Sequence, residues 1–306
     1  MNKLLVVGSI NMDIVSSVGQ FPRPGETIPS AATAFYPGGK GANQAVAAAR
    51  AGARCAMIGA VGEDPFAETL LAALQENGIA INHILRKRSS SGFAIITVNG
   101  EGENYIVLSE GANGQLTAAD AAAGAGDWSD IYAVLLQNEI PWETNLAVMN
   151  SASSSGAYVF YNPAPARAIP EPVLPLIHTL ILNETEAAAV TGLAVSDPAS
   201  AKAAAKWVLD RGTKNVIITL GEKGCYYQNE RGASLATPAF AVKPVDTTAA
   251  GDTFFGAYAA ACADGLPAEQ ALTFAAAAAA LAVTKQGAQA SIPDQAEIEA
   301  FLLQNK

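Results

Sequence analysis

Residues 43–60, NQAVAAARAGARCAMIGA, contain a predicted helix followed by a predicted strand. Asn43–Ala51 is rich in alanine and stops at Gly52, as helices often do. Ala56–Ala60 is a short apolar run typical of a buried strand. A second helix is predicted over Ala67–Gln75, stopping near Gly78. Helices and strands that alternate in this way predict βαβ units with a mainly parallel sheet.

The same alternation extends over most of the chain. Four-to-five-residue apolar runs stand between alanine-rich helical segments and predict further strands at Leu4–Val7, Ala133–Leu136, Tyr158–Tyr161, Thr179–Leu182 and Val216–Leu220. Helices on both faces of such a sheet give a three-layer α/β/α body. Ligands in these folds bind beyond the carboxyl ends of the strands.

Two segments interrupt this alternation. Ile10–Pro37 and Phe93–Leu108 are rich in β-formers and turn residues, with little helical periodicity. We expect them to form a small antiparallel sheet beside the body. Since no Ser/Gly linker or block of charge separates them from the rest, this sheet is predicted to be a lid within a single domain, residues 1–306.

Composition excludes several classes of function. The net charge of -10 argues against a nucleic-acid or anionic-membrane surface, because both need clustered Lys and Arg. The longest apolar run, Phe274–Val283, is about half of what a membrane helix needs. Three widely spaced cysteines, Cys55, Cys225 and Cys262, contain no CxxC pair and indicate reduced thiols in a cytoplasmic protein. Two histidines, His83 and His178, give little support to a histidine metal site or catalytic triad.

The strongest chemical signal is Asp246-Thr247-Thr248-Ala249-Ala250-Gly251-Asp252-Thr253. Small residues at a helix start allow consecutive backbone N–H groups to point at one anion. Asp252 then has two interpretations: a helix N-cap, or a base that takes a proton from a hydroxyl beside the bound phosphate. The flanking small residues and the second aspartate favour the base.

A similar string elsewhere shows the limit of this argument. Gly124-Ala125-Gly126-Asp127 follows an alanine-rich segment rather than preceding one. Its glycines are typical of a helix C-terminus, where the helix dipole repels anions. We therefore predict a structural stop there.

Gly38-Gly39-Lys40-Gly41-Ala42-Asn43-Gln44-Ala45 superficially resembles a phosphate loop. A P-loop needs Ser or Thr after its lysine, and here Gly41 stands there, while Ala34 replaces the first glycine. The glycines with Lys40 and Asn43 suit close approach to a polyol, and equally a tight loop that caps a helix.

Three weaker motifs follow predicted strands. In Gly8-Ser9-Ile10-Asn11-Met12-Asp13, Asn11 and Asp13 would point to one side of an extended chain and offer donors and acceptors to vicinal hydroxyls, although a turn is the commoner interpretation. Asn183-Glu184-Thr185-Glu186 opens a helix capped by Asn183 or Thr185, and Thr219–Gly224 ends a strand in a turn. The glycine fingerprint of nicotinamide-binding folds does not follow the first strand.

Together and in this order, these motifs resemble the ribokinase family of carbohydrate kinases, from Gly8 to Pro293. The resemblance includes Asn99–Asn104, Asn162–Ala166 and Gly287–Ser291. It implies a three-layer body with a β-sheet lid, and an enzyme, a phosphotransferase with an alcohol acceptor. The implied reaction is ATP-dependent phosphorylation of ribose at its 5-hydroxyl.

The resemblance also assigns roles to residues. Asp252 resembles the general base, and the N–H groups of Ala249, Ala250 and Gly251 resemble the anion hole for the phosphoryl group. The positions matching the sugar site are Asn11, Asp13, Gly39, Lys40, Gly41, Ala42, Asn43, Glu139 and Asp252. Those matching the nucleotide site are Asn183, Thr219, Leu220, Gly221, Glu222, Lys223, Gly224, Gly251, Asp252 and Ala276, the last standing where the family often has Asn or His.

Two metal ions and a dimer are implied in the same way. Glu186 matches a residue tied to Mg²⁺ through water. The positions matching a K⁺ loop, mostly through backbone oxygens, are Asp246, Thr248, Ala282, Lys285, Gly287 and Ser291. The family commonly forms homodimers through the lid sheets.

Other functions remain open at this point. A kinase for 2-deoxyribose or for a nucleoside such as adenosine would use the same fold, and the Asn11–Asp13 spacing favours two hydroxyl contacts and hence ribose. A non-catalytic sugar-binding regulator would also share it, although Gly251 and Asp252 argue for catalysis. A nicotinamide oxidoreductase lacks its glycine motif.

Overall fold

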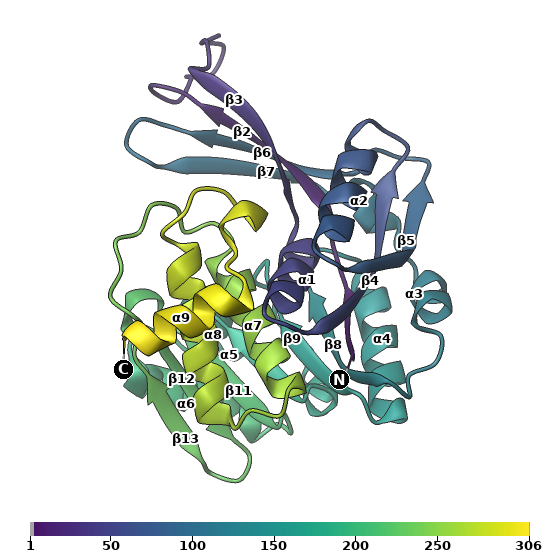
Figure 1. The fold of residues 1–306 in the computed structure, drawn as a ribbon, viewed down its shortest axis with the longest axis vertical. Helices are drawn as coiled ribbons and strands as arrows, with labels where there is room; N and C mark the ends of the chain where they lie inside the picture. Colours follow the sequence, from purple (N-terminus) through teal and green to yellow (C-terminus); the bar gives the residue numbers. More distant parts are fainter. Residues whose placement is uncertain (1–2, 306) are drawn as a thin grey trace.

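The computed structural model describes residues 3–305, which form two sheets and the helices that pack against the larger one (Figure 1). The larger sheet has nine strands in the order β13-β12-β11-β10-β9-β8-β1-β4-β5. All its neighbouring pairs are parallel except β11–β12 and β12–β13. Its strands are β1 Lys3–Val7, β4 Arg54–Gly62, β5 Ala80–Lys87, β8 Ile131–Gln137, β9 Tyr158–Asn162, β10 Thr179–Leu182, β11 Asn215–Thr219, β12 Cys225–Asn229 and β13 Ser234–Thr237.

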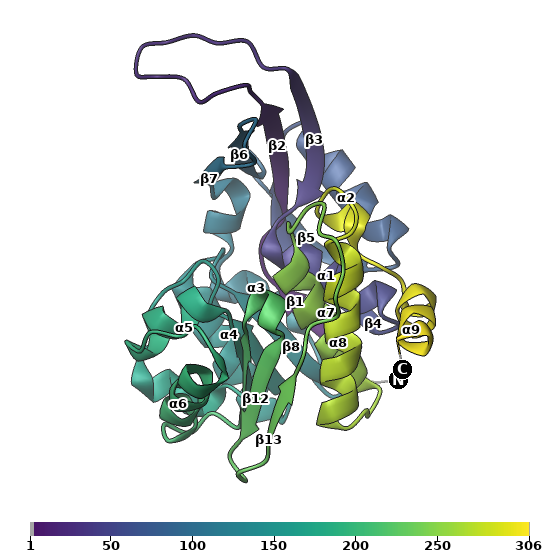
Figure 2. The ribbon, with the colours of Figure 1, turned by 90° about the vertical axis from the view of Figure 1, so that its left-hand side faces the viewer.

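Nine α-helices cover the two faces of this sheet within residues 3–305. They are α1 Lys40–Arg50, α2 Phe66–Glu76, α3 Ala118–Ala125, α4 Trp142–Ser155, α5 Glu184–Thr191, α6 Pro198–Leu209, α7 Ala250–Ala263, α8 Ala268–Ala282 and α9 Gln295–Gln304. The short 3-10 helices are η1 Gly111–Gln115, η2 Glu171–Leu176, η3 Gly221–Lys223 and η4 Gln289–Ser291. Figure 2 shows α5 and α6 on one side of the sheet and α8 and α9 on the other.

The alternation of side chains along β1 explains the three layers. Leu4 and Val6 point into a core that they share with α1, α2, α7, α8 and α9. Leu5 and Val7 point into a second core, shared with α3, α4, α5 and α6. Because both faces are covered, the central strands are apolar at nearly every position, as parallel sheets require, and polar residues such as Lys3, Gln137 and Asn162 stand at strand ends. The predicted three-layer α/β/α body is confirmed.

The smaller sheet, called the lid below, has the order β3-β2-β6-β7. Its strands are β2 Asn11–Ser17, β3 Ala32–Gly38, β6 Gly92–Val98 and β7 Asn104–Ser109. The two segments that break the helix–strand alternation do form it, and Figure 1 shows it projecting above the body. The expectation of an antiparallel sheet was wrong at its centre, where β2 and β6 pair in parallel. Both strands enter the lid from the body in the same direction and therefore pair in parallel, while the hairpin pairs β2–β3 and β6–β7 are antiparallel.

Element boundaries differ from the predictions at the site-forming ends. α1 begins at Lys40, three positions before the predicted Asn43, so residues 40–43 of the glycine-rich string form its first turn. α7 begins at Ala250, so Asp252 lies inside the first turn and not ahead of it. Glycine is unfavourable within helices, so propensity alone does not extend either helix through its glycines, and tertiary packing decides both boundaries.

Three further features bear on the sequence analysis: a helix stop, the cysteines and the lengths of the helices. α3 ends at Ala125 and Gly126 follows with a φ of 57°, so the Gly124–Asp127 string is a helix stop as predicted. Cys55, Cys225 and Cys262 are free thiols, the first two buried. Among the residues described, none of the helices has the length and apolarity needed to cross a membrane.

Candidate active site

The N-terminus of α7 carries Asp252 in its first turn. The residue preceding the helix is Ala249, which has a φ of 59° and makes no side-chain cap. Asp252 is therefore not the N-cap, and its carboxylate is bonded to side chains of α1. It is 7 % exposed, which is unusual for a carboxylate without a cationic partner in hydrogen-bonding contact.

Two amides from α1 hold this carboxylate. Asn43 Nδ2 donates to Asp252 Oδ2 at 3.1 Å, and Gln44 Nε2 donates to Oδ1 at 3.0 Å. The two helices approach closely because Gly256 has no side chain: a Cβ there would lie 2.5 Å from the Gln44 carbonyl oxygen. Sequence reasoning identified Asn43 and missed Gln44, although Gln44 belongs to the same glycine-rich string.

The start of α1 binds a second carboxylate, that of Glu139. Its Oε2 accepts hydrogen bonds from Ser9 Oγ at 2.6 Å and from the Lys40 backbone N–H at 3.1 Å. Gly39, just before the helix, has a φ of 91°, and a Cβ there would lie 2.7 Å from the Asn11 nitrogen. Glycine is therefore required at this position for the close approach of α1 to the strand β2.

The first residues of β2 complete this part of the site. Asn11 Nδ2 lies 3.5 Å from Glu139 Oε2, and Asn113 Nδ2 donates to Asn11 Oδ1 at 2.7 Å. Asn113 also exchanges hydrogen bonds with the backbone of Ile10. Asn113 was not predicted, because it stands in a short 3-10 helix without a recognisable motif.

Burial and the closeness of several charged groups shift the pKa values in this cluster. Burial, with the nearby carboxylates of Glu139 and Asp252, raises the pKa of Asp13 to about 7. Burial also raises the pKa of Glu139, although Lys40 and Ser9 oppose it. The carboxylate of Asp252 is the main cause of the raised pKa of Lys40, so this lysine is held as a cation among the acids. Such a cluster suits a ligand rich in hydroxyl groups together with cations.

Glu186 lies within electrostatic range of the same cluster, since Lys40 and Asp252 both influence its pKa, which burial raises. It is at the start of α5, where it and Asn183 form a capping box. Asn162 Nδ2 also donates to Glu186 Oε2 at 2.9 Å. Of the two caps considered, Asn183 and Thr185, the helix uses Asn183.

The predicted nucleotide-site residues come from the neighbouring strand and helices. β11 ends at Thr219, whose Oγ1 donates to the carbonyl of Leu182 at 3.3 Å, and Gly221–Lys223 form a 3-10 turn after it. Gly251 is exposed, and a Cβ there would meet nothing within 4 Å, so the space in front of the α7 N-terminus is open. Ala276 is buried within α8.

One predicted anion-hole donor already has a partner. The Ala250 N–H lies 3.3 Å from the Thr247 carbonyl, a long hydrogen bond that closes the turn before α7. Hydrogen bonds of this length are weak and readily exchanged for a charged acceptor.

The predicted K⁺-loop residues belong to two neighbouring segments. Asp246 accepts from the Thr248 N–H at 2.9 Å and from the Gly287 N–H at 3.0 Å. The side chain of Lys285 has another partner, since its Nζ pairs with Glu297 Oε1 at 2.7 Å. Ser291 Oγ donates to the carbonyl of Ala288 at 2.8 Å.

For each predicted ion the structure offers some oxygen ligands, but not a complete set of side chains. Within residues 3–305 no group of three or more His, Cys, Asp or Glu side chains is arranged to hold a metal by itself. Mg²⁺ commonly keeps its waters and is held by substrate phosphates with one or two carboxylates, as Glu186 would allow. The 287–291 segment offers oxygen ligands, including the buried and unpartnered Gln289 Oε1.

Comparison with known proteins agrees with this geometry. The profile of the pfkB family carbohydrate kinases matches residues 1–295. A ribokinase of Haemophilus influenzae is 41% identical over 300 residues, covering 98% of each chain. A deoxyribokinase of Salmonella typhi is 35% identical over 305 residues, covering 99% of each chain. The structure of an Arabidopsis thaliana ribokinase complexed with ribose and ATP superposes with a TM-score of 0.91 at 31% identity, covering 98% of each chain. The chain therefore belongs to the pfkB family of carbohydrate kinases.

Proposed function

We propose that this kinase transfers the γ-phosphoryl group of ATP to the 5-hydroxyl of D-ribose, giving ribose 5-phosphate and ADP. The observation that carries the proposal is the placement of the Asp252 carboxylate at the N-terminus of α7, beside the open space in front of Gly251. A base and an anion-binding helix end thus share one position. The ribokinase relatives and the ribose and ATP in the Arabidopsis structure support the choice of substrates.

In the proposed reaction, the sugar 5-oxygen forms a bond to the γ-phosphorus while the bond from that phosphorus to the β–γ bridging oxygen breaks. Asp252 accepts the proton of the hydroxyl, and ADP leaves with the bridging oxygen. The N–H groups of Ala249, Ala250 and Gly251 face the negative charge on the transferring group. Positioning and charge neutralisation account for most of the catalysis in such reactions.

The sugar is proposed to bind between β2 and the start of α1. Asn11 and Asp13 share one face of β2, and Glu139 lies beside Asn11. Ionised carboxylates accept hydrogen bonds from adjacent hydroxyls, and the amides of Asn11 and Asn43 both donate and accept. Lys40 and the close-packed residues Gly39, Gly41 and Ala42 would complete this side.

The nucleotide is proposed to bind along the carboxyl ends of β10 and β11, which meet at one edge of the parallel sheet. Asn183 and the turn Thr219–Gly224 would contact it there, and Ala276 would face the adenine. The small side chain of Ala276 offers no polar group for base selection, so adenine selectivity is expected to be modest.

Mg²⁺ would supply neutralisation of the ATP phosphates, with Glu186 holding one of its waters. K⁺ is proposed to bind the loop formed by Asp246, Thr248, Ala282, Lys285, Gly287 and Ser291, the lysine contributing only its backbone oxygen. Asp246 links the turn before α7 to this loop. A cation there would steady the turn that presents the anion-binding N–H groups.

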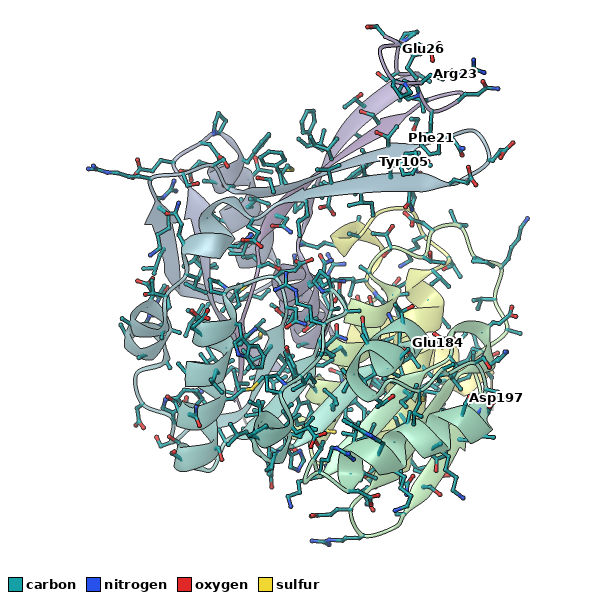
Figure 3. All side chains as sticks on the ribbon, turned by 180° about the vertical axis from the view of Figure 1, so that it is seen from behind. Phe21, Arg23, Glu26, Tyr105, Glu184 and Asp197 are labelled. Carbon is teal, nitrogen blue, oxygen red and sulfur yellow. The ribbon has the colours of Figure 1, made fainter. Side chains whose placement is uncertain are left out.

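We further propose a homodimer formed through the lid. In the lid, directly paired residues share a face, so the face opposite Asp13 carries Phe35, Ile14, Ile95 and Val107 in one row. Phe35, Ile95 and Val107 are 56%, 45% and 65% exposed, an apolar row suited to burial against a second copy. Farther out, Phe21 and Tyr105 lie side by side, with their ring centroids 4.3 Å apart (Figure 3). The free thiols are consistent with a cytoplasmic location.

A coupled assay of ADP release tests the proposal. We expect kcat/KM for ribose to exceed that for 2-deoxyribose and adenosine, and the rate to depend on Mg²⁺. The deoxyribokinase relative makes 2-deoxyribose the alternative substrate. A higher kcat/KM for 2-deoxyribose would transfer the proposal to that sugar, and no ADP release with any of the three would favour a sugar-binding regulator.

A further inference from the structure

We propose that Gln44 is a positioning residue for catalysis: together with Gln137 it anchors one oxygen of the Asp252 carboxylate, so that Oδ2 is the atom that accepts the substrate proton. This inference rests on the proposed kinase function and adds residues and an atom to it. It follows from the chain of side-chain hydrogen bonds Asp252–Gln44–Gln137, which joins α7, α1 and the carboxyl end of β8.

The two oxygens of Asp252 have different environments. Oδ1 accepts from Gln44, which is 0 % exposed and has no access to a ligand. Oδ2 accepts from Asn43, which lies at the first turn of α1 beside the proposed sugar site. Asn43 is 5% exposed and borders the proposed sugar site, so a sugar hydroxyl would reach Oδ2 by exchange with Asn43, whereas the fully buried Gln44 would keep Oδ1. The exchangeable oxygen is therefore the one that meets the hydroxyl.

The second link fixes the orientation of Gln44. A carboxylate only accepts hydrogen bonds, so Gln44 must present its NH₂ group to Asp252 and its carbonyl oxygen to the other side. There Gln137 Nε2 donates to Gln44 Oε1 at 2.7 Å. With its NH₂ used in this way, the buried Gln137 Oε1 is left without a hydrogen-bond partner. This arrangement therefore leaves one buried polar atom unsatisfied, which lowers the stability of the folded state.

Neighbouring residues hold these three side chains in place. A Cβ on Gly8 would lie 2.0 Å from Gln137 Oε1, so a glycine at the end of β1 is what makes room for the Gln137 amide. Asn145 Nδ2 donates to the Gln137 backbone carbonyl at 2.7 Å and holds its main chain. Gly256 brings α1 against α7 at Gln44, as described above. Preorganised contacts of this kind position a catalytic group before substrate arrives.

The test is a pair of near-isosteric substitutions in the full-length enzyme. Gln44→Met keeps the volume and removes the donor to Oδ1. We expect kcat to fall about 10- to 100-fold, the range for losing orientation of a catalytic group, with the KM values for ribose and ATP changed less than about threefold. Gln137→Met should lower kcat less, and the double variant should be no slower than Gln44→Met, because Gln137 acts only through Gln44.

Thr213→Val is the matched control for lost buried hydrogen bonding. Thr213 is fully buried and donates to the Leu174 carbonyl at 3.0 Å, far from the cluster in the loop before β11. It should lower Tm as the glutamine variants do but leave kcat unchanged. The inference is overturned if Gln44→Met keeps the wild-type kcat, whether or not its KM for ribose rises. Wild-type enzyme that releases no ADP would instead refute the proposed function, and the two failures are therefore distinguishable.

Discussion

Asn43 Nδ2 and Asp252 Oδ2 are 3.1 Å apart although 209 positions separate the two residues in the sequence. Each stands in the first turn of its helix, so the amino ends of α1 and α7 converge on one point at the carboxyl edge of the sheet. Helix amino ends attract anions, and the convergence also brings in the sugar-site candidates on α1. The contact is thus the junction between proposed sugar and phosphate sites.

Replacing Asp252 by asparagine tests its role as the base. Asp252→Asn keeps the shape and removes the proton acceptor, so kcat should fall about 10²- to 10⁴-fold while ribose still binds. Steady-state kinetics with calorimetric measurement of ribose binding would show this. Asp127→Asn in the similar Gly124–Asp127 string is the control and should be fully active, since that aspartate follows α3. Near-normal turnover by Asp252→Asn would remove this residue from the base role.

Gly251→Ala separates folding from phosphate binding. A Cβ at Gly251 would meet no protein atom within 4 Å, so the variant should fold with a wild-type Tm. The added methyl group would stand in the space proposed for the transferring phosphoryl group, and we expect kcat/KM for ATP to fall about tenfold or more. Gly19→Ala, which also adds a methyl group to open space but in the lid region, should keep full activity. Unchanged kinetics in Gly251→Ala would place the phosphate elsewhere.

How far the sequence could predict this site is visible in its two glutamines. Asp252, Asn43 and Lys40 stand in strings whose small residues and helix positions indicate a function, and the structure brings these residues together. Gln44 and Gln137 carry no such signal, because buried glutamines are placed by packing between elements distant in sequence. The parallel pairing of β2 with β6 was missed for the same reason, since strand pairing depends on connections across the whole fold.

The exposed apolar row of the lid should control formation of the proposed dimer. Val107→Glu places a charge at the β7 end of the exposed apolar row, and we expect the proposed dimer to dissociate, as measured by light scattering after size exclusion. Leu303→Glu is the matched control, because Leu303 is 66% exposed on α9 and belongs to no such row. It should leave the mass unchanged. A wild-type protein that is monomeric at high concentration, or a Val107→Glu dimer, would contradict the lid interface.

The turn before α7 predicts a dependence on monovalent cations. Asp246 joins Thr248 to Gly287, so the proposed K⁺ site and the anion-binding turn share one side chain. The rate in KCl should exceed that in LiCl at equal ionic strength, and Asp246→Ala should lose most of this stimulation. Asp294→Ala, which removes the N-cap of α9 downstream of the loop, is the control and should keep the response to K⁺. Equal rates in both salts for the wild type would refute the cation site.

The raised pKa of Asp13 predicts a pH dependence of both stability and sugar binding. The pKa is 3.8 for a free side chain and about 7 in the folded protein, where Glu139, Asp252 and Lys40 are its charged neighbours. Between these values the folded state binds more protons than the unfolded state, so this group lowers stability as pH rises from about 4 to about 7. Chemical denaturation across this range should show a decline that is shallower in Asp13→Asn.

Sugar binding should respond in the opposite direction. Ionised Asp13 accepts hydrogen bonds from two vicinal hydroxyls, whereas the protonated form accepts fewer, so the KM for ribose should fall as pH rises through about 7. In Asp13→Asn the KM should be higher and nearly independent of pH over this range. A wild-type KM that does not change with pH would show that Asp13 keeps one protonation state, or that it does not contact the sugar. The KM of Asp13→Asn distinguishes these two cases, because the substitution raises the KM for ribose where the carboxylate contacts the sugar and leaves it unchanged where it does not.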